Sequence, residues 1–390
     1  MKPLEQLILS TLVYYDIFDY PLTLVEIHRN LLRVKPQETC ELKTYNFNDI
    51  KDSTVLNVMN YHGIKPLDNV LGNISNNNIM LQQSNLNKFP FILLDNESNN
   101  AVIKKGNYTI SSNLVIPKNI NFTIDAGVNL KLINSASILS YSSINLNGKA
   151  DDIITVTTTP DSRSSVIIVY TDNVSIIQHT NFKNLSYPSS MGSLITGSVT
   201  FYEANVNINN CKFMSNFLTD DNLNIVRSQF TLSNSQFINS LSDAIDIDFS
   251  SGRLDNLSII NSGNDALDFS TSIVTGSNLY INGSLDKGIS IGEKSEISLN
   301  NIHIENSKYG LVIKDDSSLY GNNINLDNIE YGLALYRKKK RYKPPRSTIN
   351  NIKFNNIRKN KILVEDNAKL SIDGQPYLNY TYDTKESFEN

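Results

Sequence analysis

Apolar residues return at a fixed interval along most of this chain. Six pairs of large apolar residues, the two members of each pair separated by one residue, follow one another at intervals of 22 residues. Within these segments the apolar positions alternate with a period of two, which is typical of strands rather than helices. The pairs are Leu223/Ile225, Ile245/Ile247, Leu267/Phe269, Ile289/Ile291, Leu311/Ile313 and Leu333/Leu335.

A column of asparagines runs in parallel with the apolar pairs. Its steps along the chain are 24, 22, 22, 23, 22 and 28 residues. Two columns at a constant offset mean that each repeat contains at least two strands, and a weaker run (FTL, SIV, SEI, SSL) indicates a third. Propeller blades need about 40 residues, whereas three short strands with their turns fill a coil of about 22. The column consists of Asn210, Asn234, Asn256, Asn278, Asn301, Asn323 and Asn351.

The pattern predicts an all-β fold, a right-handed parallel β-helix with three strands in each coil of about 22 residues. Like residues then stack at the strand spacing of about 4.8 Å, so that the asparagines form a ladder and the apolar pairs fill the core. We expect the β-helix to span residues 101–377 and a C-terminal tail to span residues 378–390. Residues 36–100 are rich in asparagine and are expected to connect or to cap the open end of the β-helix.

The first 35 residues differ from the rest of the chain. LEQLILSTLVYY has helical apolar spacing, and TLVEIHRNLL begins a second helix with Thr23 and Glu26 as a capping box. We therefore expect a small α-helical appendage, a hairpin over residues 1–35 that resembles the start of a winged helix. DNA is not an expected partner, because no basic recognition helix follows. Glu5 and Gln6 interrupt the apolar start, which argues against a signal peptide.

Composition narrows the possible partners and cofactors. The net charge of −4 gives the chain no general attraction to nucleic acids or anionic membranes. Cys40 and Cys211 lie far apart and the four histidines are scattered, so neither a disulfide framework nor a zinc site is expected. No run of about 18 apolar residues predicts a membrane span. Only 17 glycines are present, so asparagine is expected to fill left-handed turn positions.

Aspartates gather on one predicted face of the β-helix. The stretch SDAIDIDF is followed one coil later by NDALDF. If Ile245 and Ile247 point inward, Asp246 and Asp248 point outward from the same strand. Asp246 then stacks with Asp268 on the next coil, and Asp243 stacks with Asp265. Together they form an acidic face, which consists of Asp243, Asp246, Asp248, Asp265 and Asp268.

Stacked carboxylates have three interpretations. Carboxylates one coil apart are separated by roughly 5 Å, and alternate residues of one strand by roughly 7 Å. These separations match those of the carboxyl pairs in retaining and inverting glycosidases. Such a cluster also accepts Ca²⁺, the one cofactor that this composition suggests. The third interpretation is that the aspartates are only the solvated side of a repeat.

A run of basic residues coincides with the single long step of the asparagine column. The segment YRKKKRYKPPR, residues 336–346, is therefore expected to loop out of one coil, and we name it the basic loop. It is either a solvated loop or a contact for a polyanion such as an acidic polysaccharide. Its candidate binding residues are Arg337, Lys338, Lys339, Lys340 and Arg341.

Four short stretches carry a family resemblance. SDAIDI, NDALDF, DKGISIG and YGLVIK follow one another one coil apart. The coils over roughly residues 100–375 resemble the pectin-lyase-like right-handed β-helix superfamily, whose polygalacturonase-type hydrolases carry N-T-D, D-D, G-H-G and R-I-K on neighbouring coils. By position, Asp243 is similar to the N-T-D aspartate and Asp265 to the second aspartate of the pair. The coils also resemble β-helix modules of bacterial surface proteins, which suggests a surface or extracellular location but implies no activity.

The chain departs from the hydrolase motifs at three positions. Asn264 stands in place of the first paired aspartate, Lys287 in place of the histidine and Val312 in place of the arginine, and only Lys314 of the last motif is kept. The loss of a paired carboxyl and of the histidine removes a candidate proton donor and its neighbour. Whether the protein is an enzyme is therefore left open.

The leading hypothesis is a non-catalytic, carbohydrate-associated β-helix that presents the acidic face and the basic loop to a polysaccharide or another polyanion. The first alternative is a hydrolase or lyase of uronic-acid polymers, and the second is a structural spacer or adhesin rod. The sequence leaves the oligomeric state open. Catalytic candidates are Asp243, Asp265 and Asp268, and further binding candidates are Asp246, Asp248, Lys287 and Lys314.

Overall fold

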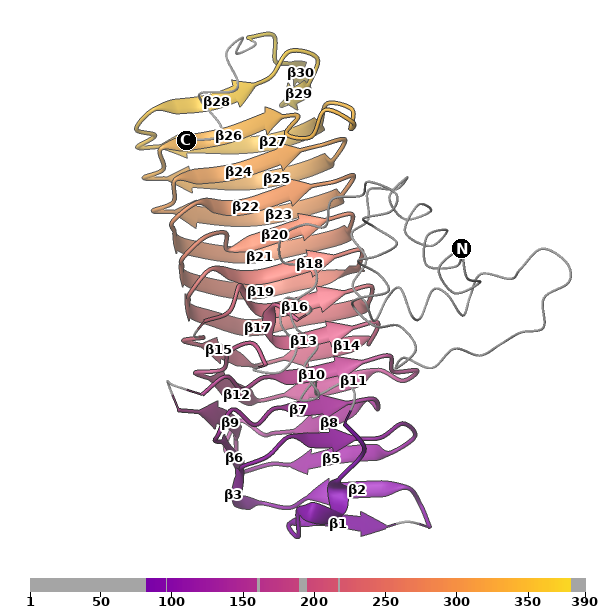
Figure 1. The fold of residues 1–390 in the computed structure, drawn as a ribbon. Coiled ribbons are helices and arrows are strands. Elements are labelled where there is room, and N and C mark those ends of the chain that lie inside the picture. The colour runs from indigo at the N-terminus through magenta and orange to yellow at the C-terminus, as the bar shows by residue number, and fades with distance from the viewer. Residues whose placement is uncertain (1–81, 96, 160–161, 189–194, 217, 380–390) are drawn as a thin grey trace, which may run out of the picture. The chain divides into compact units, whose positions relative to one another are not determined.

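The computed structural model describes residues 82–95, 97–159, 162–188, 195–216 and 218–379. These residues, apart from Ile195, belong to one compact unit. The predicted helical hairpin over residues 1–35 lies outside the described residues. Among the residues described, the one helical element is a short 3-10 helix, η3 (Leu86–Lys88), and all other elements are strands (Figure 1).

One strand of every coil contributes to a parallel sheet of 11 strands, which we name the first sheet. The apolar pairs predicted from the sequence lie in these strands with their side chains in the core; Leu223 and Ile225, for example, are fully buried. The strands are β4 (Leu114–Ile116), β7 (Ile138–Ser140), β10 (Val166–Val169), β13 (Gly197–Tyr202), β16 (Asp221–Val226), β18 (Asp243–Asp248), β20 (Leu267–Ser270), β22 (Lys287–Gly292), β24 (Tyr309–Lys314), β26 (Tyr331–Tyr336) and β28 (Asn360–Val364).

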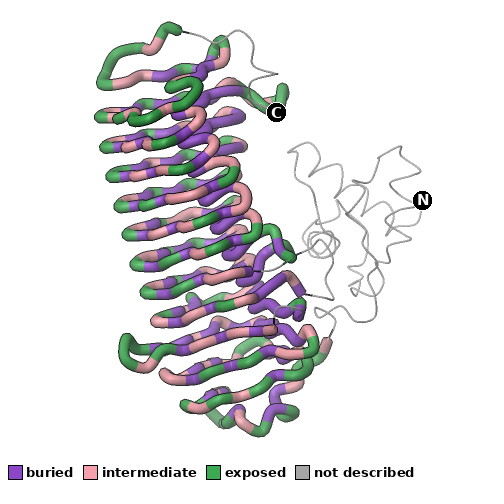
Figure 2. The backbone as a smooth tube through the Cα atoms, turned by 90° about the vertical axis from the view of Figure 1, so that its left-hand side faces the viewer, coloured by how far each residue is buried: buried purple, intermediate pink, exposed green. Residues whose placement is uncertain are grey.

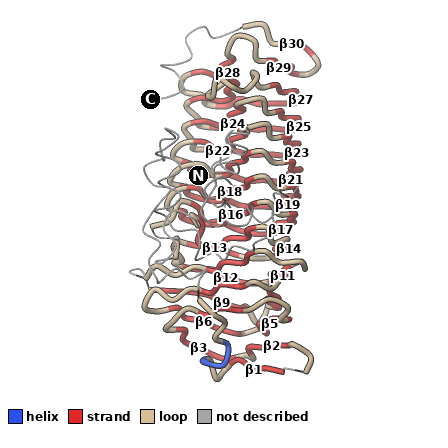
Figure 3. Tube along the Cα trace, turned by 45° about the vertical axis from the view of Figure 1, so that its right-hand side comes forward, coloured by secondary structure: helices blue, strands red, loops and turns tan. Residues whose placement is uncertain are grey.

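The other strands of each coil form the second sheet. In the early coils they are separate: β2 (Asn100–Ile103), β3 (Gly106–Ile110), β5 (Asn121–Asp125), β6 (Val128–Leu132), β8 (Ile144–Asn147), β9 (Ile154–Thr158), β11 (Ser175–Gln178), β12 (Thr180–Lys183), β14 (Val206–Asn209) and β15 (Lys212–Met214). In the later coils they are continuous: β17 (Gln229–Ser240), β19 (Ser251–Ser262), β21 (Ile273–Ser284), β23 (Glu296–Glu305), β25 (Ser318–Asp327) and β27 (Arg346–Asn355), followed by β29 (Lys369–Ile372). The strands stack in columns (Figure 3), as predicted for a parallel β-helix.

The asparagine column forms the predicted ladder and explains the continuous strands. From Asn234 to Asn351 its members have φ between 49° and 59°, the left-handed conformation that asparagine tolerates better than most residues. Asn256 Nδ2 donates to Asn234 Oδ1 at 2.8 Å, and Asn301 Nδ2 donates to Asn278 Oδ1 at 2.7 Å. Because the turn takes a single residue, the second and third strands of these coils run together as one bent strand.

A buried serine ladder, which we did not predict, lines the turn between the two sheets. The Oγ atom of each serine accepts a hydrogen bond from a backbone N–H one coil earlier, at 2.9–3.1 Å. The ladder supplies acceptors to buried N–H groups that would otherwise lack them. Its members are Ser228, Ser250, Ser272, Ser295 and Ser317.

The core fills the interior of the coils. Along the chain, buried residues that point into it alternate with more exposed residues that point outward (Figure 2). A stack of phenylalanines runs through it, with ring centroids 5.0 Å apart for Phe182 and Phe213 and 4.6 Å for Phe213 and Phe237. No helix of the described part of the chain is long and apolar enough to cross a membrane.

At each end of the described solenoid, one strand pairs antiparallel with its neighbour. β1 (Ile92–Asp95) pairs antiparallel with β2, and Leu86, Phe89 and Ile92 are buried in the core. A 3-10 helix and a strand thus precede residue 101, and their apolar side chains belong to the same core as the coils. At the other end, β29 pairs antiparallel with β30 (Gln375–Pro376).

Candidate functional site

The acidic face lies on the first sheet, on β18 and at the start of β20. Asp246 pairs in register with Asn224 on one side and with Asp268 on the other, and Asp268 pairs with Ser290. These pairings are those expected from the 22-residue period. Because the apolar residues on either side belong to the core, the carboxylates of Asp246 and Asp268 face away from it.

Two members of the acidic face also hold the coils together. Asp243 Oδ1 accepts the backbone N–H of Asp265 at 2.8 Å and the side-chain amide of Asn264 at 2.7 Å. Asp265 Oδ1 in turn accepts the backbone N–H of Lys287 at 3.0 Å. Asp243 and Asp265 are buried, at 8% and 2% exposure. They are therefore structural acceptors as well as candidate catalytic groups.

Burial and mutual repulsion raise the pKa values of these carboxyls. The pKa of Asp243 rises to about 7, first because the group is buried and second because Asp265 lies beside it. The pKa of Asp265 rises to about 6, through burial and the charge of Asp268, against the opposing effect of Lys287. The pKa of Asp248 rises to about 7 for the same kind of reason. These carboxyls therefore titrate close to neutral pH, where an ordinary aspartate is fully ionised.

Two lysines flank the acidic face on the following coils. Lys287 Nζ lies 3.3 Å from Asp265 Oδ1 and also contacts the carboxylate of Asp286. Burial lowers the pKa of Lys287, but Asp265 and Asp286 raise it more, so the net shift is upward and the ammonium stays charged. Lys314, at the end of β24, is 8% exposed. Burial lowers its pKa, but Asp268, Tyr336 and Glu293 together raise it more, so the net shift is upward. Along the first sheet, the carboxylates on β18 and β20 are thus followed by lysines on β22 and β24.

The basic loop connects β26 to β27, beginning with the last residue of β26 and ending with the first residue of β27, and it is attached to the turns beside the first sheet. Lys339 Nζ lies 2.8 Å from Glu293 Oε1, and the backbone N–H of Lys339 donates to Asp315 Oδ1 at 2.8 Å. Glu293 Oε2 accepts a hydrogen bond from Ser270 Oγ, the last residue of β20, at 2.9 Å. The structure therefore brings the basic loop next to the acidic face, a proximity that sequence spacing did not reveal.

Within the basic loop the cations differ in what they contact. Lys339 is paired with Glu293, and Arg341 lies over the ring of Tyr342 at 5.3 Å from its centroid. The five predicted binding residues of the loop, Arg337, Lys338, Lys339, Lys340 and Arg341, are all exposed.

Three carboxylates on and beside the acidic face form a candidate cation site. Asp220, Asp221 and Asp243 each offer a carboxylate oxygen, and these oxygens lie within 4.8 Å of one another. Asp221 Oδ2 also accepts a hydrogen bond from Thr196 Oγ1 at 2.6 Å. Oxygen-rich groups of this kind suit Ca²⁺. Asp220 was missed from the sequence, although it lies one coil before Ser242, whose Oγ donates to it at 2.9 Å.

Comparison with protein families gives one match. Residues 223–375 match the family model for the right handed beta helix region. This match fits the pectin-lyase-like right-handed β-helix superfamily that the coils resemble, and it agrees with the predicted handedness. A search of curated proteins finds no match.

A search of solved structures finds several chains of low similarity. The periplasmic alginate epimerase AlgG is 11% identical, with a TM-score of 0.45 over 74% of this chain and 81% of its own. The Agl-KA catalytic domain is 12% identical, with a TM-score of 0.40 over 70% of this chain and 62% of its own. The catalytic domain of a GH87 alpha-1,3-glucanase in complex with nigerose is 13% identical, with a TM-score of 0.37 over 71% and 64%. None of these likenesses assigns an activity to this chain.

Proposed function

We propose that this protein binds an acidic polysaccharide along the outer side of the first sheet, between the acidic face and the basic loop. The observation that carries the proposal is the contact through Glu293, which links Ser270 at the edge of the acidic face to Lys339 of the basic loop. This contact joins hydrogen-bonding carboxylates and exposed cations into one surface that spans several coils.

The chemistry of such a surface matches that of a uronic-acid polymer. Each sugar unit of that polymer carries hydroxyl groups, which donate to carboxylates and amides, and a carboxylate, which pairs with lysine and arginine. The raised pKa values of Asp243, Asp248 and Asp265 reduce the negative charge of the acidic face near neutral pH. Repulsion between this face and an anionic chain is reduced accordingly.

The proposal includes a bound Ca²⁺ ion. A Ca²⁺ ion held by Asp220, Asp221 and Asp243 would neutralise carboxylates that otherwise repel one another and the ligand. Binding of the polysaccharide should then be tighter in the presence of Ca²⁺ than in the presence of a chelator.

The experiment is a calorimetric titration of the full chain with an oligogalacturonate, with and without Ca²⁺. The variant Lys338→Glu/Lys340→Glu reverses two exposed charges of the basic loop and leaves the Lys339–Glu293 pair intact. We expect binding to weaken about tenfold or more, because attraction at several ligand carboxylates is lost. The matched control, Lys118→Glu/Lys131→Glu, reverses two lysines on the early coils and should bind like the wild type.

Equal affinity of the two double variants would contradict the proposal, and no binding by the wild type would favour the rigid rod as a spacer.

A second candidate function, cleavage of the polymer, is favoured by the pKa of about 6 at Asp265 beside Lys287, since such a carboxyl can donate a proton near neutral pH. Analysis of the same mixtures for new reducing ends or unsaturated products decides between binding and cleavage.

A further inference from the structure

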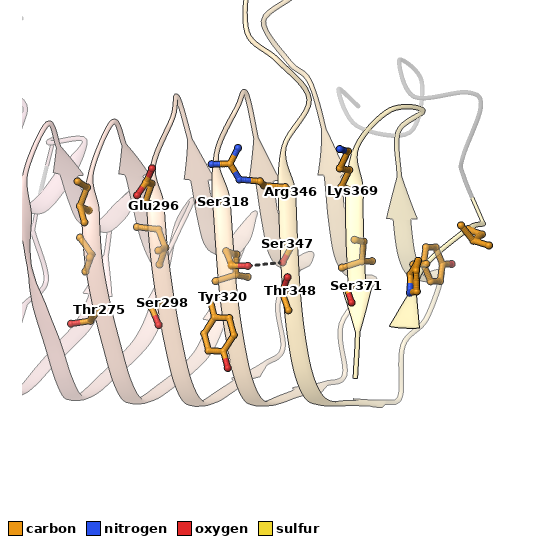
Figure 4. Close-up of a pocket in the computed structure, with 18 residues that line it drawn as sticks. Thr275, Glu296, Ser298, Ser318, Tyr320, Arg346, Ser347, Thr348, Lys369 and Ser371 are labelled. Carbon is orange, nitrogen blue, oxygen red and sulfur yellow. Dashed lines mark hydrogen bonds between the residues drawn. The ribbon is translucent and has the colours of Figure 1, made fainter. Parts of the chain in front are cut away.

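A groove lies on the second sheet (Figure 4), whereas the acidic face belongs to the first sheet. Its volume is about 740 Å³, within the range of about 300–1,000 Å³ typical of ligand sites. Strands β21, β23, β25, β27 and β29 form it, and residues 376–378 border it at the C-terminal end. None of these strands carries a residue of the acidic face.

A row of hydroxyl groups runs along this groove. Five consecutive coils place a serine, threonine or tyrosine at the same register position. Neighbouring members are one strand apart, about 4.8 Å. Within the described residues no side-chain hydrogen bond engages any of these hydroxyls, so their donors and acceptors remain available to a ligand. The row consists of Thr275, Ser298, Tyr320, Thr348 and Ser371.

Two cations come from neighbouring coils at one side of the same groove. Arg346 and Lys369 occupy directly opposite positions on β27 and β29 (Figure 4). Like charges placed opposite each other on neighbouring strands destabilise the pair. Neither side chain forms an ion pair with any described carboxylate. An anion bound between them would relieve the repulsion, which identifies this side of the groove as a place for a negatively charged group.

Apolar surface is also available in the groove. Tyr320 is 54% exposed and Ile273 is 61% exposed. A tyrosine ring in this setting offers a flat apolar face together with a hydroxyl. Sugar rings have the matching combination, because they present C–H groups on their faces and hydroxyls at their edges.

We propose that this groove is a second ligand site, which binds a short acidic oligosaccharide. A carboxylate of the ligand lies between Arg346 and Lys369, a sugar ring packs on Tyr320, and the sugar hydroxyls exchange hydrogen bonds with the hydroxyl row. The site does not depend on ligand binding at the acidic face, because the two surfaces belong to different sheets.

The test is a calorimetric titration of the full chain with trigalacturonate. Arg346→Gln/Lys369→Gln removes the cation pair but keeps the backbone hydrogen bonds from Arg346 N to Ser317 O and from Lys369 N to Pro345 O. We expect this variant to lose one class of binding sites, with affinity there at least about tenfold lower. Tyr320→Ala should weaken the same class about three- to tenfold.

The matched control, Lys353→Gln/Lys361→Gln, removes two charges outside the groove and should leave both classes of sites unchanged. Lys338→Glu/Lys340→Glu should affect only the site at the first sheet, so the two proposals can fail separately. Wild-type affinity in Arg346→Gln/Lys369→Gln would overturn the groove site. Equally tight binding of inorganic sulfate or of the neutral maltotriose would overturn its assignment to an acidic sugar.

Discussion

At the scale of single residues, Asp243 links stability to pH. Its pKa in the folded protein is about 7, mainly because of burial, whereas that of an unfolded aspartate is about 3.9. Between these values the folded state retains a proton that the unfolded state has lost. The free energy of unfolding therefore contains a contribution from Asp243 that is complete below about pH 4 and is lost as the pH rises through about 7.

The variant Asp243→Asn isolates this contribution. An asparagine keeps an oxygen that can accept from Asn264 and from the backbone of Asp265, but it does not ionise. We expect the variant to resemble the wild type at about pH 4.5 and to exceed it in unfolding free energy by on the order of 1–3 kcal/mol at about pH 8. Urea denaturation at the two pH values measures the difference. A gap of the same size at both would contradict the assignment.

At the residue scale, the directions of some side chains could be predicted from the sequence, but their hydrogen-bond partners could not. The outward direction of Asp246 and Asp268 followed from period-two alternation. The role of Asp243 and Asp265 as acceptors for the next coil did not follow, because it depends on the backbone direction at the start of each strand. Alternation assigns a side chain to one face of the sheet but does not specify which N–H it meets.

At the scale of elements, the serine ladder should contribute to stability through each of its members. Ser272 Oγ accepts from Ser250 N at 3.0 Å and donates to Ile247 O at 3.0 Å. Replacement by alanine leaves a buried N–H without an acceptor, so we expect Ser272→Ala to lower the unfolding free energy by about 1–3 kcal/mol. Ser298→Ala, on the outward side of β23, should change it by less than about 0.5 kcal/mol. Similar losses in the two variants, measured by urea denaturation, would contradict a special role for the ladder.

Strand positions were the part of the fold best predicted from the sequence. The apolar pairs and the asparagine column fixed the register of β16 to β27, because inward residues must repeat once per coil. The antiparallel ends were not predicted, since β1 and β30 belong to no repeat. The contact of the basic loop with Glu293 could not be predicted either, because that loop interrupts the 22-residue period and its position depends on tertiary packing.

At the scale of the whole described unit, the coils are connected mainly to their immediate neighbours. Stability in such a solenoid is approximately a sum over coils and the interfaces between them. Asn256 meets its equivalent in the preceding coil, Asn234, 22 residues away, and Asn261 meets Asn239 at the same separation. A segment of 22 residues is therefore a removable unit of the architecture.

Deletion of residues 258–279 should remove one coil and leave the solenoid folded. It joins Leu257 to Tyr280, which pairs with Ser258 in the intact protein, so every later side chain keeps its face. Deletion of residues 258–278 is shorter by one residue and joins Leu257 to Leu279. This junction places two inward residues side by side and reverses the faces of the strand that follows.

Far-UV circular dichroism and thermal melting measure the outcome of both deletions. We expect the 22-residue deletion to keep a β spectrum and a cooperative transition at a somewhat lower temperature, because one coil and one interface are lost. The one-residue-shorter deletion should lose the transition, because β21 would turn its apolar side chains to solvent and its polar ones to the core. Equal behaviour of the two proteins would mean that the turns absorb a change of register, and that the 22-residue period does not control the stacking of the coils.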